Sequence, residues 1–151
     1  MHIVIDFGGT DISIGLVQNG TVISITRLPA LSQEGLLRRL SDVIGSIYQL
    51  LSQSRYAISE CTGIGIAMSG VVDPISRTLL INEIYSDAVG FPFVQWFEVV
   101  FGLPCILEND AEAALIGEAA YTVARGETNA VLLGVSRMLE IKQAPKDVLQ
   151  N

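Results

Sequence analysis

Apolar residues follow two kinds of spacing along this chain, and each kind predicts a different element. Short apolar runs bounded by turn residues predict strands. These runs are Ile3–Phe7, Ile12–Gln18, Thr21–Arg27, Gly63–Met68, Thr78–Ile81, Cys105–Glu108 and Ala130–Leu133. Apolar residues at helical spacing predict helices over Ser32–Ser54, Phe91–Phe101 and Ala111–Ala124. The order of three antiparallel strands followed by alternating helices and strands predicts an α/β sheet with mixed strand directions.

Turn and capping residues set the expected boundaries of these elements. Asn19-Gly20 between the second and third strands is typical of a type I′ hairpin. Ser32 is the expected N-cap of the first helix, and Gly102 is the expected stop of the second. Gly126 is expected to end the third helix. The polar stretch from residue 136 onward, interrupted by a proline at 145, predicts a tail of different character.

Composition restricts the classes of partner. Half of the 151 residues are hydrophobic and 17% are charged, which is typical of one compact domain. A formal charge of −7 with scattered basic residues argues against nucleic-acid or anionic-membrane partners. The first strand follows Met1 at once and there is no membrane-length apolar run, so we expect a cytoplasmic protein. Cys61 and Cys105 lack a CxxC partner and predict two reduced, half-buried thiols, with no zinc site.

The first candidate site is the turn after the first strand, where Asp6 leads into Gly8, Gly9 and Thr10. Glycines let the backbone turn sharply and approach a ligand closely. Successive N–H groups beside a threonine hydroxyl suit phosphate oxygens, and a carboxylate there suits a metal ion. The same residues are equally compatible with an ordinary tight hairpin.

A second group of polar residues follows two later strands. Asn109 and Asp110 lie where a strand ends and a helix begins. One interpretation is structural: Asn109 is the N-cap, with a glutamate at position 112 that approximates a capping box. The other is functional: Asn109 binds a polyol and Asp110 accepts the proton of an attacking hydroxyl. Ser69 and Gly70 end a neighbouring strand and are expected in the same cleft, whereas Asn82 is either a ligand contact or an exposed loop residue.

Three motifs in order resemble the amino-terminal lobe of ROK-family sugar kinases, within the actin-like ATPase superfamily. They are Asp6–Thr10, Gly63–Asp73, and Leu103-Pro104 with Glu108–Glu118. The resemblance implies an RNase H-like (actin-like ATPase) α/β fold, with a mixed sheet flanked by helices in a single lobe. It implies a lobe over residues 1–134 and an atypical tail over 135–151.

The resemblance also implies roles for the candidate residues. Asp6 would help to hold Mg²⁺ through water, and Gly8, Gly9 and Thr10 would approach the ATP phosphates. The sugar, a hexose or an N-acetylhexosamine, would be bound by Ser69, Gly70, Asn82, Asn109 and Asp110. Asp110 would be the general base that assists transfer of the γ-phosphoryl group to a sugar hydroxyl. The family more often has proline where Ser69 stands.

The sequence departs from the family pattern at the carboxyl end. Members are roughly twice as long, as a two-lobe enzyme requires, and carry a second glycine-rich loop where this chain reads Gly134–Leu139. We therefore expect little or no kinase activity from these residues alone. The alternative is a non-catalytic sugar-sensing or dimerisation module, a relative of ROK-like repressors without a DNA-binding domain. An exposed inter-lobe surface predicts a homodimer.

Overall fold

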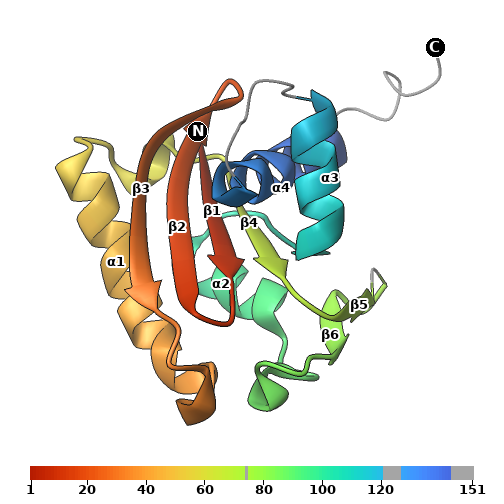
Figure 1. Ribbon diagram of the computed structural model, residues 1–151. Coiled ribbons are helices and arrows are strands. Elements are labelled where there is room, and N and C mark those ends of the chain that lie inside the picture. The colour runs from red at the N-terminus through yellow and green to blue at the C-terminus, as the bar shows by residue number, and fades with distance from the viewer. Residues whose placement is uncertain (74, 121–126, 144–151) are drawn as a thin grey trace.

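The computed structural model describes residues 1–73, 75–120 and 127–143. A five-stranded sheet forms the centre of the fold, with the strand order β3-β2-β1-β4-β7 (Figure 1). The sheet strands are β1 (His2–Phe7), β2 (Asp11–Gln18), β3 (Thr21–Pro29), β4 (Gly63–Met68) and β7 (Cys105–Asn109). The helices are α1 (Leu40–Gln53), α2 (Phe93–Phe101), α3 (Asp110–Ala120) and α4 (Glu127–Gln143). The predicted mixed α/β sheet flanked by helices is confirmed.

Strand directions place three strand ends at one edge of the sheet. β1 is antiparallel to β2, parallel to β4, and β4 is parallel to β7. The carboxyl ends of β1, β4 and β7 therefore lie side by side, as the arrowheads of β1 and β4 show in Figure 1. Open α/β sheets bind ligands at such an edge.

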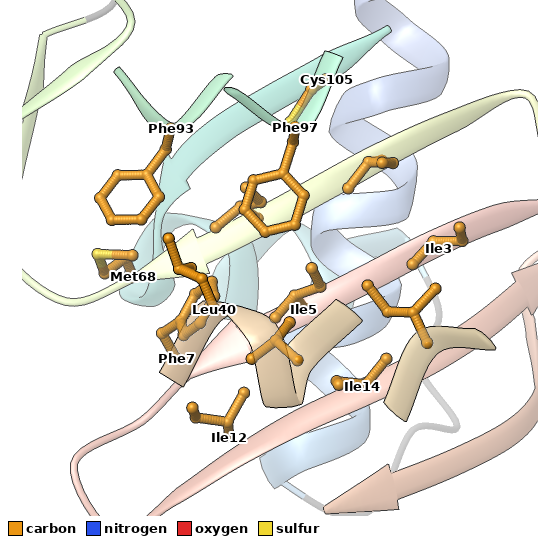
Figure 2. Packing of buried hydrophobic residues seen from close by; sticks show 14 of the residues in the cluster. Ile3, Ile5, Phe7, Ile12, Ile14, Leu40, Met68, Phe93, Phe97 and Cys105 are labelled. Carbon is orange, nitrogen blue, oxygen red and sulfur yellow. The ribbon is translucent and has the colours of Figure 1, made fainter. Parts of the chain in front are cut away.

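The larger hydrophobic core fills the face of the sheet that α1 and α2 cover. Alternate residues of β1, namely Ile3, Ile5 and Phe7, point into it and are fully buried. Figure 2 shows Phe93 and Phe97 of α2 and Leu40 of α1 gathered over these strands. The period-two alternation of β1 explains this arrangement, because every second side chain faces the same layer.

Helix α4 covers part of the opposite face, and here the predicted strand Ala130–Leu133 is wrong. Those four residues lie inside a helix whose buried side chains include Leu132, Val135 and Leu139, a helical spacing that continues past the short run. The apolar run by itself fits a strand or a helix, and packing on the sheet decides between them. A Cβ at Gly134 would lie 1.6 Å from the Ala113 carbonyl oxygen, so the glycine permits close contact with α3. The expected boundary between residues 134 and 135 lies within α4, and residues 144–151 of the expected tail lie outside the described residues.

The start of α1 also differs from the prediction. Ser32 is not its N-cap: two 3-10 turns occupy Ser32–Glu34 and Leu37–Arg39, and the helix begins at Leu40. The Asp87 carboxylate accepts hydrogen bonds from the backbone N–H groups of Leu36 and Leu37, at 2.9 Å each. A cap from 50 residues away therefore fixes this segment, and local spacing does not reveal it.

The other boundaries agree closely with expectation. Asn19 and Gly20 have φ values of 50° and 71°, as a type I′ turn requires, and Gly102 ends α2 with φ 66°. The predicted run Thr78–Ile81 is β6, and it pairs with a three-residue strand that the sequence did not predict, β5 (Val71–Asp73). The end expected for the third helix, including Gly126, lies outside the described residues.

Two further findings concern the cysteines and the helices. The cysteines at 61 and 105 are fully buried and not half-buried as expected, with exposures of 4% and 3%. In the part of the chain that the structure describes, every helix is too short or too polar to cross a membrane.

Candidate functional site

Three loops that carry the candidate residues meet at the edge formed by β1, β4 and β7. β1 leads into Gly8–Thr10, β4 leads into Ser69 and Gly70, and β7 leads into Asn109 and α3. Adjacent parallel strands bring these loops together although the sequence separates them by up to a hundred residues. The structure therefore gathers the residues that the sequence singled out at one end of the sheet.

The turn after β1 is held by a buried tyrosine. The Tyr85 hydroxyl donates a hydrogen bond to the Gly8 carbonyl oxygen at 2.6 Å, and Tyr85 is fully buried. Burial raises the pKa of Tyr85 to about 12, with a smaller contribution from the charge of Asp6. The hydroxyl therefore stays a donor at neutral pH. A Cβ at Gly8 would lie 2.8 Å from the Asp11 carbonyl oxygen, so the turn accepts only glycine there.

An open hollow of about 580 Å³ lies against this turn. It is lined by Asp6, Gly8, Gly9, Thr10, Asp11, Ser13 and Arg27. Backbone amides, two hydroxyls and a guanidinium are donors, and the two carboxylates are acceptors or cation ligands. The hollow is polar throughout and suits a phosphate group accompanied by a cation.

The pKa of Asp6 depends on Asp110 as well as on burial. The pKa of Asp6 is raised to about 6, chiefly by burial and to a smaller extent by the nearby charge of Asp110. Negative charges on Asp6 in β1 and on Asp110, the first residue of α3 after β7, thus disfavour each other. A divalent cation beside them would relieve that repulsion, so the chemistry of these residues fits Mg²⁺.

Asn109 has a structural role. Its Oδ1 accepts hydrogen bonds from the backbone N–H groups of Ala111 and Glu112, at 2.9 and 3.1 Å, so it caps α3. Its Nδ2 donates to the Gly70 carbonyl oxygen at 2.7 Å and so joins the loop after β4. The second N–H of Nδ2 has no partner among the described residues and is the group left for a ligand.

Asn82 is not an exposed loop residue, since only 7% of its surface is exposed. Its Nδ2 donates to the Ser69 carbonyl oxygen at 2.7 Å. Its Oδ1 accepts from the backbone N–H groups of Ile84 and Tyr85, at 2.8 and 2.6 Å. Asn82 therefore joins the loop after β4 to the segment that holds Gly8.

The loop after β4 opens onto a second hollow of about 420 Å³. Gly70, Val71, Val72, Glu108, Asn109 and Glu112 line it. Gly70 has φ +107°, and a Cβ there would lie 2.0 Å from the Ile81 carbonyl oxygen, so no other residue fits. Lys142 of α4 pairs with Glu108 at the border of this hollow.

Sequence reasoning missed Ser13, Arg27 and Tyr85. Ser13 is the cross-strand partner of both Asp6 and Arg27, which places the three side chains in one row on one face. A two-residue turn without irregularity would pair Ser13 with Thr26. A β-bulge near Leu16 shifts the register by one residue and brings Arg27 into the row. Tyr85 carried no signal, because its partner is a backbone carbonyl 77 residues away.

The fold and these strand-end loops define the class: one lobe of the actin-like ATPase fold, the fold of the matching solved structures. The ROK family profile matches residues 2–138. The chain therefore belongs to the ROK family, as the resemblance predicted.

The chain is similar to sugar kinases of known sequence and structure. It is 26% identical over 112 residues to N-acetylmannosamine kinase of Vibrio cholerae, which covers 74% of this chain and 37% of that protein. It is 29% identical over 117 residues to β-glucoside kinase of Listeria monocytogenes, covering 75% and 36%. A ROK family glucokinase from Streptomyces griseus, crystallised with glucose and AMPPNP, aligns with a TM-score of 0.63 and 26% identity, covering 83% of this chain and 38% of that one. The chain is thus a sugar kinase-like lobe that spans little more than a third of these relatives.

Proposed function

We propose that this chain is the lobe of an ATP-dependent sugar kinase that holds part of the phosphate chain and part of the sugar. One observation carries the proposal: β1 and β7 flank β4 and run parallel to it, so the glycine turn after β1 and Asp110, which follows β7, lie at the same edge of the sheet, near enough for the charge of Asp110 to raise the pKa of Asp6. Phosphoryl transfer needs a donor phosphate beside an acceptor hydroxyl and its base, and this edge offers both kinds of group.

The phosphate half of the reaction is assigned to the first hollow. The backbone of Gly8 and Gly9 and the hydroxyl of Thr10 would bind phosphate oxygens of ATP, because they line the hollow with donors. Asp6 would help to hold Mg²⁺ through water, and bound Mg²⁺ supplies charge neutralisation for the transferring phosphoryl group. Tyr85 keeps the Gly8 turn in place.

The sugar half is assigned to the loops after β4 and β7. Ser69, Gly70 and the remaining N–H of Asn109 would contact sugar hydroxyls, and Asn82 holds that loop through its hydrogen bond to the Ser69 carbonyl oxygen. Asp110 would accept the proton of the attacking hydroxyl as that oxygen bonds to the γ-phosphorus and ADP departs. A hexose or an N-acetylhexosamine is the expected substrate, because the relatives are named for glucose, glucosides and N-acetylmannosamine.

By itself, this lobe is expected to be a weak or inactive catalyst. Both hollows are open to solvent, whereas phosphoryl transfer depends on groups that surround the reacting atoms and exclude water. The relatives are nearly three times as long as the matched segment. We therefore expect ligand binding without efficient turnover from these residues alone.

A thermal-shift screen and an ADP-release assay test the proposal together. A panel of glucose, N-acetylmannosamine, N-acetylglucosamine and a β-glucoside is added with and without Mg·AMPPNP for binding, and with Mg·ATP for turnover. We expect stabilisation by at least one sugar, lost in Asp110→Asn and kept in the matched α3 variant Glu118→Gln. If no sugar in the panel stabilises the chain, the assignment of the loops after β4 and β7 as a sugar site is contradicted. Rapid sugar-dependent ADP release, abolished by Asp110→Asn, would show instead that this lobe is catalytically sufficient.

A further inference from the structure

A guanidinium borders the phosphate hollow on the side opposite β4. Arg27 lies on the edge strand β3, two strands from Asp6, and both line the hollow. The cross-strand partners Asp6, Ser13 and Arg27 form a single row, so their side chains leave the same face of the sheet. In the next row on this face, Leu132 of α4 packs over Gly15. Within the row of Asp6, Ser13 and Arg27 the exposure rises toward the edge strand: Ser13 is buried, Asp6 is partly buried and Arg27 is exposed.

The charges in this hollow are unbalanced for an anionic ligand. Asp6 and Asp11 are carboxylates, the glycine turn contributes neutral amides, and Arg27 is the one basic side chain among the lining residues. A triphosphate keeps net negative charge even with Mg²⁺ bound. A second positive group is therefore needed to hold it beside two carboxylates.

Arg27 is available for such a contact. Arg39, Arg77 and Lys142 each pair with a carboxylate, whereas Arg27 has no ion pair among the residues that the structure describes. Its side chain is exposed at the border of the hollow. A guanidinium presents planar paired donors that match phosphate oxygens.

We propose that Arg27 binds the phosphate chain of the donor nucleotide. This inference rests on the proposed function, since it assigns a further contact in the same phosphate site. None of the seven lining residues has an aromatic or large apolar side chain that would stack on a base. The part of the site in this lobe therefore recognises a linear phosphate chain, and Mg·tripolyphosphate binds it as well as Mg·AMPPNP.

A plainer role for Arg27 is a solvated charge on an edge strand, which discourages pairing with other chains. Binding measurements separate the two roles. Titration of the ¹⁵N-labelled chain with Mg·AMPPNP or Mg·tripolyphosphate gives the dissociation constants, and the amide spectrum reports whether each variant is folded. The variants are Arg27→Gln, Arg27→Lys, Thr10→Ala and the exposed control Arg38→Gln.

We expect Arg27→Gln to weaken binding of both phosphate compounds about tenfold, the effect of losing one charged hydrogen bond. Arg27→Lys should keep part of the affinity, and Arg38→Gln should keep all of it. If the native chain binds and Thr10→Ala weakens binding while Arg27→Gln does not, the role of Arg27 is refuted and the phosphate site stands. If Mg·AMPPNP binds and Mg·tripolyphosphate does not, the site recognises the base of the nucleotide, and the proposed ligand class, a linear phosphate chain, is wrong. If the native chain binds neither compound at millimolar concentration, the proposed phosphate site fails and Arg27 with it.

Discussion

Replacing the carboxylate at the end of β1 should make the protein more stable at neutral pH. The pKa of Asp6 is raised from 3.8 to about 6, first by burial and then by the charge of Asp110. A rise of one pKa unit corresponds to about 1.4 kcal/mol. Ionised Asp6 therefore lowers the free energy of unfolding by about 3 kcal/mol relative to a neutral group in the same place.

The sign of the pH dependence follows from this raised pKa. Below pH 3.8 Asp6 is protonated in both states and contributes no penalty. Between pH 3.8 and about 6 the folded state binds the extra proton, so stability falls as the pH rises and then levels off. Asp6→Asn removes this term, and its advantage over the native chain should grow by about 2 kcal/mol between pH 4.5 and 7.5.

Urea unfolding across this pH range, followed by circular dichroism, measures the effect. Asp110→Asn should give a smaller gain, because it removes only the second cause of the raised pKa. The exposed helix variant Glu118→Gln should leave the pH profile unchanged. If Asp6→Asn destabilises the protein at pH 7.5, or if its advantage does not change with pH, the account of two opposed carboxylates is wrong.

Three further outcomes follow from the packing. Tyr85→Phe removes the hydrogen bond to the Gly8 carbonyl oxygen. It should lower the free energy of unfolding by about 1–2 kcal/mol and weaken phosphate binding. Equal phosphate binding by the native chain and the variant would show that this hydrogen bond does not position the turn. Gly134→Val would place side-chain atoms against the Ala113 carbonyl and should expose the amides of α4 to hydrogen exchange, whereas Gly45→Ala, with no atom within 4 Å of the new Cβ, should not. Sedimentation should detect a homodimer, since large apolar side chains are exposed on β3, on the β5–β6 hairpin and on each of the helices α1, α2, α3 and α4; a monomer at high concentration would contradict this.

The glycine turn and the strand-end residues could be predicted because their signals are local. Asp6 lies near the end of an apolar strand, and Asn109 stands immediately before a helix, so both positions are fixed by a few neighbouring residues. The parallel pairs β1–β4 and β4–β7 then bring the two loops to one edge of the sheet, an order of strands that the sequence did not predict.

The parts that could not be predicted depend on distant contacts. The β-bulge that brings Arg27 opposite Ser13 leaves no mark in the apolar pattern. Asp87 fixes the start of α1 from another segment, and Tyr85 reaches the Gly8 turn in the same way. The short apolar run before Gly134 fits a strand as well as a helix. Its packing against α3 and the sheet makes it a helix, and this packing cannot be seen in the local sequence. Local propensity is weak where tertiary contacts decide.

Hydrogen exchange with and without ligands tests the central claim most directly, because it reports where on the chain the ligands bind. The chain is incubated with Mg·AMPPNP, with the sugar that stabilises it, or with both. We predict that the nucleotide protects residues 8–13, that the sugar protects residues 69–71 and 109–112, and that β6 and α1 are unaffected. Protection confined to other segments, or none at either loop, would contradict the assignment of this edge of the sheet as the phosphate and sugar site of a ROK kinase lobe.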